Sequence, residues 1–148
     1  MNTPIAREIA ARFMYLRRMA MTAIGERLAP MGIGVAEYLV LFRLGQEDDV
    51  PQQDLEHDSG LGASGVSRMV SRLVDEGWVS MSIDPTDRRR RRLAITDAGR
   101  DKERELAPLV DEAARLVIDG LTDAEERQLL KLLNKAGASL QAPERASA

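Results

Sequence analysis

The sequence predicts a mainly helical fold with one small β-hairpin, and three observations carry this prediction. Apolar residues recur every three to four positions at both ends of the chain, which is the period of an amphipathic helix. Residues 61–96 show in order the patterns of a turn, an amphipathic helix and two short strands. Five consecutive arginines, Arg88 to Arg92, stand in the turn between those strands. This order of elements is typical of a winged helix-turn-helix, with the arginine turn as its wing.

Composition narrows the class of protein. The 148 residues are 44% hydrophobic, which is enough to build one core. The absence of cysteine excludes disulfides, thiolate metal sites and cysteine nucleophiles, and a single histidine argues against a zinc site. No secretory segment or membrane-length apolar run occurs, so we expect a cytoplasmic protein without a membrane partner. The net charge of −3 argues against generic affinity for nucleic acids, but the positive charge is concentrated within residues 61–96.

The first predicted helix covers roughly residues 4–29, and the Pro and Gly residues at 30–34 end it. Its apolar stripe consists of Ile5, Ile9, Phe13, Leu16, Ala20, Ile24 and Leu28. Arg12, Arg17 and Arg18 lie on the polar side of this helix. A solvated face is the simpler interpretation of these arginines. The alternative is that one of them binds an acidic ligand, because a guanidinium pairs with a carboxylate through two hydrogen bonds.

A second helix is predicted over residues 35–44, and a minimal third strand can pair near Val50. Pro51 to His57 is the predicted first helix of the helix-turn-helix, with proline at the position where its missing N–H costs nothing. Its acidic residues are Asp54, Glu56 and Asp58. Carboxylates near a phosphate backbone repel it, so this helix weakens DNA binding unless its acids orient arginines of the next helix by ion pairing.

The next helix has two contrasting faces. Its apolar stripe consists of Val66, Met69, Val70, Leu73 and Val74, at helical spacing. Its other face consists of Ser64, Ser67, Arg68, Ser71 and Arg72. Hydroxyls and guanidinium groups without bulky apolar neighbours are typical of a helix that enters the major groove of DNA. Gly77 ends this helix, as a residue that tolerates the left-handed conformation should.

The wing combines turn chemistry with a dense positive charge. Asp84 to Asp87 form the turn, and the arginine run leads into the second strand at Leu93. Arginine runs are often merely solvated. Five like charges in one turn repel each other, however, and an anionic partner explains them better. Side chains at 91 and 92 point to opposite faces of a strand. We expect one of these arginines to touch phosphate and the other to pair with an acid such as Asp84.

The C-terminal third is predicted to form two helices. The first runs from Asp97 to about Ile118 with a kink at Pro108, and Thr122 begins the second with a capping box. The final helix extends to about Leu140 and carries leucines on more than one side. This apolar surface is wider than a single-chain core needs, so we expect a dimer interface with the N-terminal helix of a second copy. The alternative is that the leucines only cover the chain's own long helix.

Four consecutive motifs resemble those of the MarR family of bacterial transcriptional regulators. They are the helix Ser64–Leu73, the strand start Glu76–Val79, the wing Asp84–Arg89 and the exit segment Leu93–Arg100. The resemblance in layout extends over nearly the whole chain. It implies a winged helix-turn-helix over residues 35–96, and helices at 1–34 and 97–148 that form a homodimerisation domain. It also implies a regulator, most often a repressor, that binds a palindromic operator.

The resemblance assigns functional residues as well. Double-stranded DNA would be contacted by Ser64, Ser67, Arg68, Ser71 and Arg72 in the major groove, and by Arg88, Arg89 and Arg90 in the minor groove. Such regulators often bind a small aromatic or phenolic acid between the dimerisation helices and the winged domain. Residues placed to line that site are Phe13, Met14, Arg17, Tyr38 and Phe42. No metal or other cofactor is implied.

Two further classes of function were weighed. A protein-interaction module with reduced DNA binding would use the acidic face from Asp54 to Asp58, but such a module has little reason to keep an arginine wing. An enzyme has no support, because the sequence offers no metal constellation, phosphate loop or positioned nucleophile. His57, Asp58 and Ser59 are neighbours on one helix and point in different directions, so they cannot act as a triad.

Overall fold

A computed structural model describes residues 3–59 and 61–141, apart from the side chains at 3, 57–59 and 139–141. The elements are α1 (Thr3–Leu28), the 3-10 turn η1 (Ala29–Met31), α2 (Val35–Gln46), β1 (Val50–Pro51), α3 (Gln52–Ser59), α4 (Gly62–Asp75), β2 (Val79–Ile83), β3 (Arg91–Ile95), α5 (Asp97–Ile118) and α6 (Asp123–Gln141). The mainly helical fold with a small wing is therefore confirmed.

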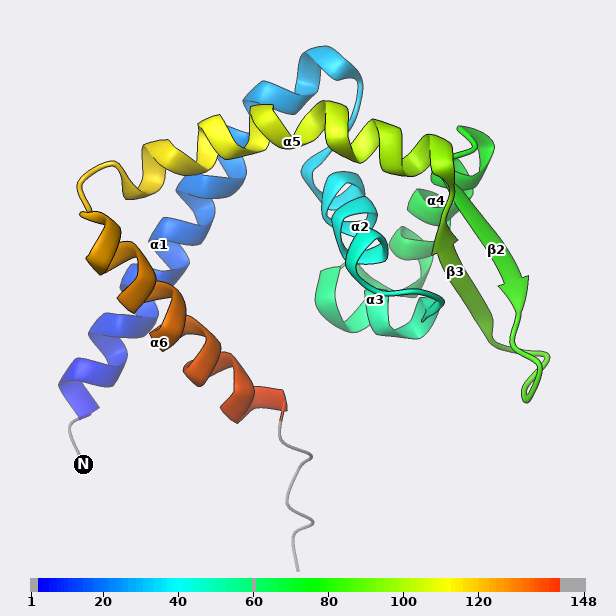
Figure 1. The fold of residues 1–148 in the computed structure, drawn as a ribbon. Coiled ribbons are helices and arrows are strands. Elements are labelled where there is room, and N and C mark those ends of the chain that lie inside the picture. The colour runs from blue at the N-terminus through cyan, green and yellow to red at the C-terminus, as the bar shows by residue number, and fades with distance from the viewer. Residues whose placement is uncertain (1–2, 60, 142–148) are drawn as a thin grey trace, which may run out of the picture.

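The elements form a body and an arm that are bridged by α5 (Figure 1). The body contains α2, α3, α4 and the three strands, and the arm contains α1 and α6. Helix α5 begins beside the strands, packs against α2 in the body and against α1 in the arm, and leads into α6. A body that carries the wing is thus connected to an arm that projects away from it.

The sheet is antiparallel in the order β1-β3-β2. Val79 pairs with Ile95 and Ile83 pairs with Arg91, which fixes the wing hairpin, while Val50 pairs with Leu93 as the expected third strand. Pro51 continues β1, and α3 begins one residue later, at Gln52, than the sequence indicated. The reason is that Val50 and Pro51 both lie opposite β3, so the chain turns helical only after this pairing ends.

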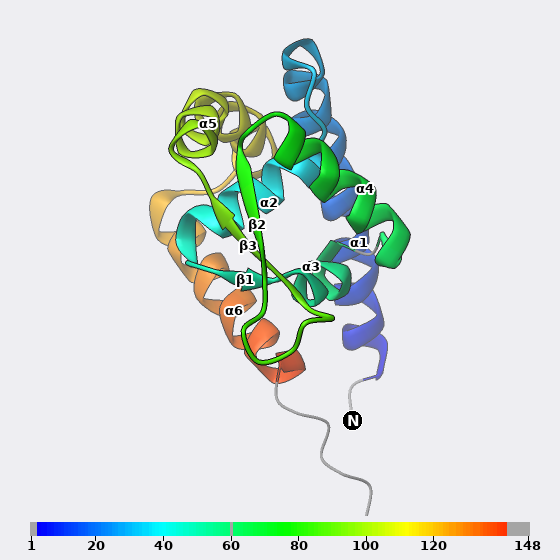
Figure 2. The same ribbon diagram turned by 90° about the vertical axis from the view of Figure 1, so that its right-hand side faces the viewer.

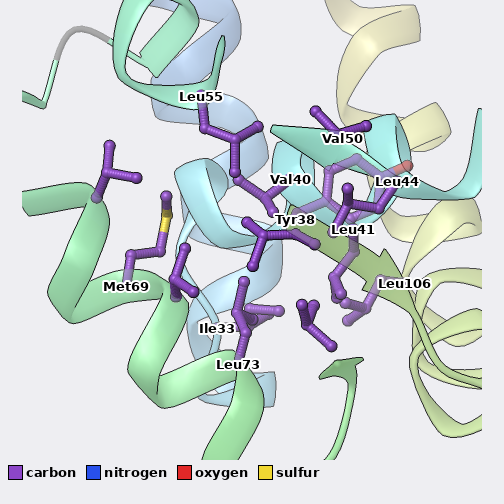
Figure 3. Close-up of a cluster of buried hydrophobic side chains, with 14 of the residues drawn as sticks. Ile33, Tyr38, Val40, Leu41, Leu44, Val50, Leu55, Met69, Leu73 and Leu106 are labelled. Carbon is purple, nitrogen blue, oxygen red and sulfur yellow. The ribbon is translucent and has the colours of Figure 1, made fainter. Parts of the chain in front are cut away.

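The hydrophobic core lies within the body, where α2 is surrounded by α4, the sheet and α5 (Figure 3). Leu41, Leu44 and Leu73 are fully buried there. Leu28 from the end of α1 and Leu106 from α5 are buried in the same cluster. Parts of both flanking helices therefore belong to the core of the winged domain, so this core includes residues outside 35–96.

The start of α5 is locked to the base of the wing. The Thr96 side chain accepts a hydrogen bond from the Gly99 backbone N–H at 3.0 Å and donates one to the Gly77 carbonyl at 2.6 Å. A β-carbon at Gly99 would lie 2.0 Å from the Trp78 carbonyl oxygen, closer than two such atoms can approach. Glycine at 99 therefore permits the close packing that joins α5 to the strands.

Within residues 3–59 and 61–141, no single helix combines the length and the hydropathy needed to cross a bilayer. The segments Pro4–Met31 and Val35–Gln46, bent by 91° at their junction, meet the criterion only when they are taken together.

Candidate nucleic-acid interface

Helix α4 presents two chemically different faces, as its sequence predicts. Val66, Met69, Val70 and Leu73 are buried against the body. The exposed residues of the opposite face include Ser64, Ser67, Arg68 and Ser71. Gly62 starts the helix with a φ of +69°, a conformation that glycine adopts without strain. Burial of one stripe holds α4 in place, while hydroxyls and a guanidinium remain accessible to a ligand.

Arg72 is placed differently from its helical neighbours. Its Nη1 lies 2.7 Å from Oε1 of Glu37 on α2, and its Nη2 donates a hydrogen bond to the Gly32 carbonyl. One of the two interpretations of the acids of α3 was that they orient Arg68 or Arg72 by ion pairing, but the partner of Arg72 comes from α2. Asp54 of α3 lies 3.9 Å from Arg43. The side chain of Asp58 lies outside the described residues.

Two acidic residues fix the base of the wing. Asp84 accepts hydrogen bonds from the Thr86 hydroxyl at 2.6 Å and the Thr86 backbone N–H at 2.8 Å, and Arg92 Nη1 lies 3.1 Å from its other oxygen. These Thr86 and Arg92 bonds hold the pKa of Asp84 well below its usual range. Arg92 also reaches Asp49, with its Nε 2.8 Å from the carboxylate. The expected pairing of one strand arginine with Asp84 is confirmed, and that arginine is Arg92.

The remaining wing arginines are exposed. Arg88 and Arg89 lie at the turn, and Arg91 lies at the start of β3. Arg90 Nε is 3.4 Å from Asp87, an exposed contact that contributes little stability. Helix α4 packs against β2, and Figure 2 shows α4 and the β2–β3 hairpin on the same side of the body. The structure thus places α4, with its exposed hydroxyls, and the arginine turn on the same side of the molecule.

A cavity of about 220 Å³ lies where α1, α2 and α3 meet. Its lining residues are Arg17, Met21, Ala36, Leu39, Val40, Arg43 and Leu55. Arg17 is the single expected ligand residue among them. Met14 lines a neighbouring hollow along α1, again with Arg17. Two arginines at an otherwise apolar lining suit a small molecule with an acidic group and an apolar body.

The expected aromatic lining lies elsewhere. Tyr38 is 5% exposed and belongs to the core, where burial and the nearby Glu103 and Asp111 raise the pKa of its hydroxyl. Phe42 stacks on Tyr38 with ring centroids 6.3 Å apart, and Phe13 is exposed on α1. The rotation of α2 explains the difference, since positions 36, 39, 40 and 43 face the cavity and position 38 faces the core. That helical spacing is the signal from which the positions of Leu39 and Arg43 in the cavity lining could have been predicted.

In the part of the chain that the structure describes, no group of three or more histidine, aspartate or glutamate side chains is arranged to hold a metal ion.

Fold and surface together define a winged helix-turn-helix protein of the kind found in transcriptional regulators. Residues 34–90 match the model of the MarR family, which confirms the resemblance seen in the sequence. A MarR transcriptional regulator from Methanosarcina mazei is 27% identical, with a TM-score of 0.77 and with 91% of this chain and 99% of that chain covered.

Two more distant structures share the fold. Sco3205, a MarR family transcriptional regulator from Streptomyces coelicolor solved in complex with DNA, is 22% identical with a TM-score of 0.75, and 96% of this chain and 92% of that chain are covered. BpsR from Bordetella bronchiseptica, whose DNA binding is regulated by 6-hydroxynicotinic acid, is 20% identical with a TM-score of 0.72. The match to BpsR covers 87% of this chain and 92% of that chain.

Proposed function

We propose that this protein is a sequence-specific DNA-binding transcriptional regulator, acting as a repressor on a palindromic operator. The observation that carries the proposal is the exposed face of α4 beside the arginine wing. A helix whose buried stripe fixes it to a body, and whose outer face offers hydroxyls and a guanidinium, can read base edges in a major groove. The Sco3205 complex supports the proposal, because a protein of the same fold is bound to DNA.

The proposed contacts divide between the two grooves. Ser64, Ser67, Arg68 and Ser71 lie on the exposed face of α4 and would reach bases and phosphates of the major groove. The wing arginines 88–90 would enter the minor groove, whose negative potential is concentrated where the groove is narrow. Arg72 is omitted from this set, because its guanidinium already binds Glu37 and the Gly32 carbonyl.

We propose a homodimer whose interface is formed by the arm. Large apolar side chains of α1 and α6 are exposed in the single chain, including Met14 at 72%, Ile9 at 62% and Leu130 at 60%. Apolar surface of this extent requires a cover. A second copy related by a two-fold axis would provide it and would place two recognition helices about 10 base pairs apart. Residues 1–34 and 97–148 would then serve dimerisation, and residues 35–96 DNA binding.

We also propose a small aromatic or phenolic acid as effector, bound in the cavity between α1, α2 and α3. Arg17 would meet the acidic group, and the apolar lining would meet the ring. The regulation of BpsR by 6-hydroxynicotinic acid supports an effector of this chemistry. Calorimetry with a panel of aromatic acids tests the proposal. A binder is expected to lower operator affinity, and a panel without any binder would contradict it.

Fluorescence anisotropy tests the function itself. The wild-type protein is titrated against duplex DNA from its own upstream region and against the same duplex scrambled, over a series of salt concentrations. Sequence-selective binding whose log K falls steeply with log salt is expected, because arginine–phosphate contacts release counterions. If neither the upstream duplex nor duplexes from a genome-wide binding selection are preferred over scrambled DNA, the regulator proposal fails. The interaction-module alternative then replaces it.

A further inference from the structure

A small cluster ties the recognition helix to the end of the arm. It consists of Arg72 on α4, Glu37 on α2, the Gly32 carbonyl and the Gly34 N–H, and is called here the Arg72 clamp. One Glu37 oxygen lies 2.7 Å from Arg72 Nη1, and the other accepts the Gly34 N–H at 2.8 Å. Arg72 Nη2 donates to the Gly32 carbonyl. One arginine therefore holds both Gly32, which closes η1, and Glu37, whose side chain accepts the N–H of Gly34 at the start of α2.

The position of these groups in the fold makes them a junction. Helix α1 runs directly into η1, which ends at Gly32 in a left-handed conformation with a φ of +68°. Ile33 and Leu73, which neighbour the clamp in sequence, are both buried in the core. The arm thus ends at a backbone carbonyl that is hydrogen-bonded to Arg72 of α4. A change in the direction of the arm would therefore change the direction of α4.

Burial favours the clamp over a direct DNA contact. The Glu37 side chain is 12% exposed, and removing Arg72 would leave a carboxylate close to the core with the Gly34 N–H but without a cation. The Arg72 side chain is 48% exposed, yet its charge is balanced by this carboxylate. A guanidinium that has its own carboxylate within hydrogen-bond distance gains less from a phosphate than one without. Arg68, one turn earlier on α4, is exposed and has no ion-pair partner among the described residues, so it can serve that purpose.

We propose that Arg72 is a positioning residue that fixes the angle between the recognition helix and the arm, and that does not contact DNA. The inference rests on the proposed function. In a dimer joined through the arms, this angle sets the separation of the two recognition helices. The clamp therefore determines which spacing of operator half-sites the dimer accepts, while Arg68 and the wing supply the contacts.

The variants follow from the geometry. Lysine in R72K keeps the charge but has a single donor point, so it cannot bridge Glu37 and the Gly32 carbonyl in the same way. Glutamine in E37Q can still accept the Gly34 N–H but loses the charge that holds Arg72. R68K is the matched control, since it makes the same exchange one turn earlier on the exposed face of α4.

Anisotropy titrations use the operator and duplexes in which the half-site spacing is changed by one or two base pairs, over a salt series. We expect wild-type protein and R68K to retain the preference for one spacing. R72K and E37Q are expected to reduce that preference about tenfold, a change of about 1.4 kcal/mol, with an unchanged salt slope. A slope lower by about 0.9 in R72Q would instead identify Arg72 as a phosphate contact and overturn the inference.

Thermal unfolding of the DNA-free protein tests whether the Arg72 clamp exists, independently of whether the protein binds DNA. In a double-mutant cycle, R72Q and E37Q should each lower the Tm, and the double variant should lose less than the sum. Additive losses would overturn the clamp. Coupled losses together with unaltered spacing preference would overturn the positioning role. Wild-type protein that selects no DNA sequence would remove the proposed function, and with it this role, whatever the unfolding cycle shows.

Discussion

Asp84 is the residue on which the geometry of the wing depends. Its carboxylate binds two groups of Thr86 and one nitrogen of Arg92, and it is 7% exposed. Through Arg92 the same network reaches Asp49, in the loop before β1. The turn that carries the exposed arginines is therefore anchored at its base by the carboxylates of Asp84 and Asp49.

D84N is predicted to lower the Tm at pH 7. Because the pKa of Asp84 is depressed in the folded protein, its stabilisation is present above the unfolded pKa of about 3.9. That stabilisation is lost as the pH falls towards the depressed value. The Tm difference between wild type and D84N should therefore shrink below about pH 4. The control is D48N, at a fully exposed carboxylate of the loop before β1. Thermal unfolding followed by circular dichroism measures both, and a pH-independent difference would contradict the assignment.

R68A is predicted to weaken operator binding by about 1–3 kcal/mol and to relax specificity at one base pair, if Arg68 reads a guanine. R88A and R89A are predicted to weaken binding to all sequences equally and to lower the salt slope by about 0.9 for each lost phosphate contact. Anisotropy on the operator and on single-base variants distinguishes the two patterns. Unchanged operator affinity in R68A would show that Arg68 does not contact the bases of the operator.

Which pairings were predictable depended on separation along the chain. The pairing of one of the arginines at 91 and 92 with Asp84 was predicted, because a hairpin brings residues seven or eight apart together, and the structure shows that this arginine is Arg92. The pairing of Arg72 with Glu37 joins residues 35 apart on different helices, and local patterning gives no sign of it. Arg72 therefore looked from the sequence like one more member of the positive face of its helix.

Among the elements, the junction of β2 with α5 is the most constrained. G99A is predicted to destabilise the protein by about 1–3 kcal/mol, because the added methyl group would overlap the Trp78 carbonyl and force the backbone to shift. G137A is the matched control, since nothing lies within 4 Å of the position its methyl group would take. Urea unfolding measures both variants. Equal stability of G99A and wild type would show that α5 can move away from the strands.

Hydrophobic periodicity predicted every long helix and the wing, because burial of one stripe is a local property of the sequence. It did not predict the rotation of α2 about its axis. Tyr38 and Phe42 lie on a broad apolar face, and the side of that face that meets α5 is decided by tertiary packing. The aromatic residues were therefore expected to line the cavity, and the positions of Leu39 and Arg43 in its lining were not predicted. The start of α3 differs from the prediction by one residue for a similar reason, since Pro51 pairs with β3.

For the whole molecule, the exposed apolar side chains of the arm predict a homodimer. L130D is predicted to shift a dimer towards monomers and to weaken operator binding, because a buried carboxylate at the interface has no partner. The side chain is 60% exposed in the single chain, so the fold itself should persist. Sedimentation velocity gives the oligomeric state and circular dichroism gives the fold. Q128D, an exposed polar position of the same helix, is the control. A dimer that is undisturbed by L130D would place the interface elsewhere.

We propose that α4 and the wing engage DNA together, in two symmetric copies. Hydroxyl-radical footprinting on the preferred duplex is the first test of this arrangement. Two protected segments are expected, related by two-fold symmetry and centred about 10 base pairs apart. Each should be flanked by minor-groove protection that disappears in an R88A/R89A variant. A single protected segment, or flanking protection that persists without these arginines, would contradict the account.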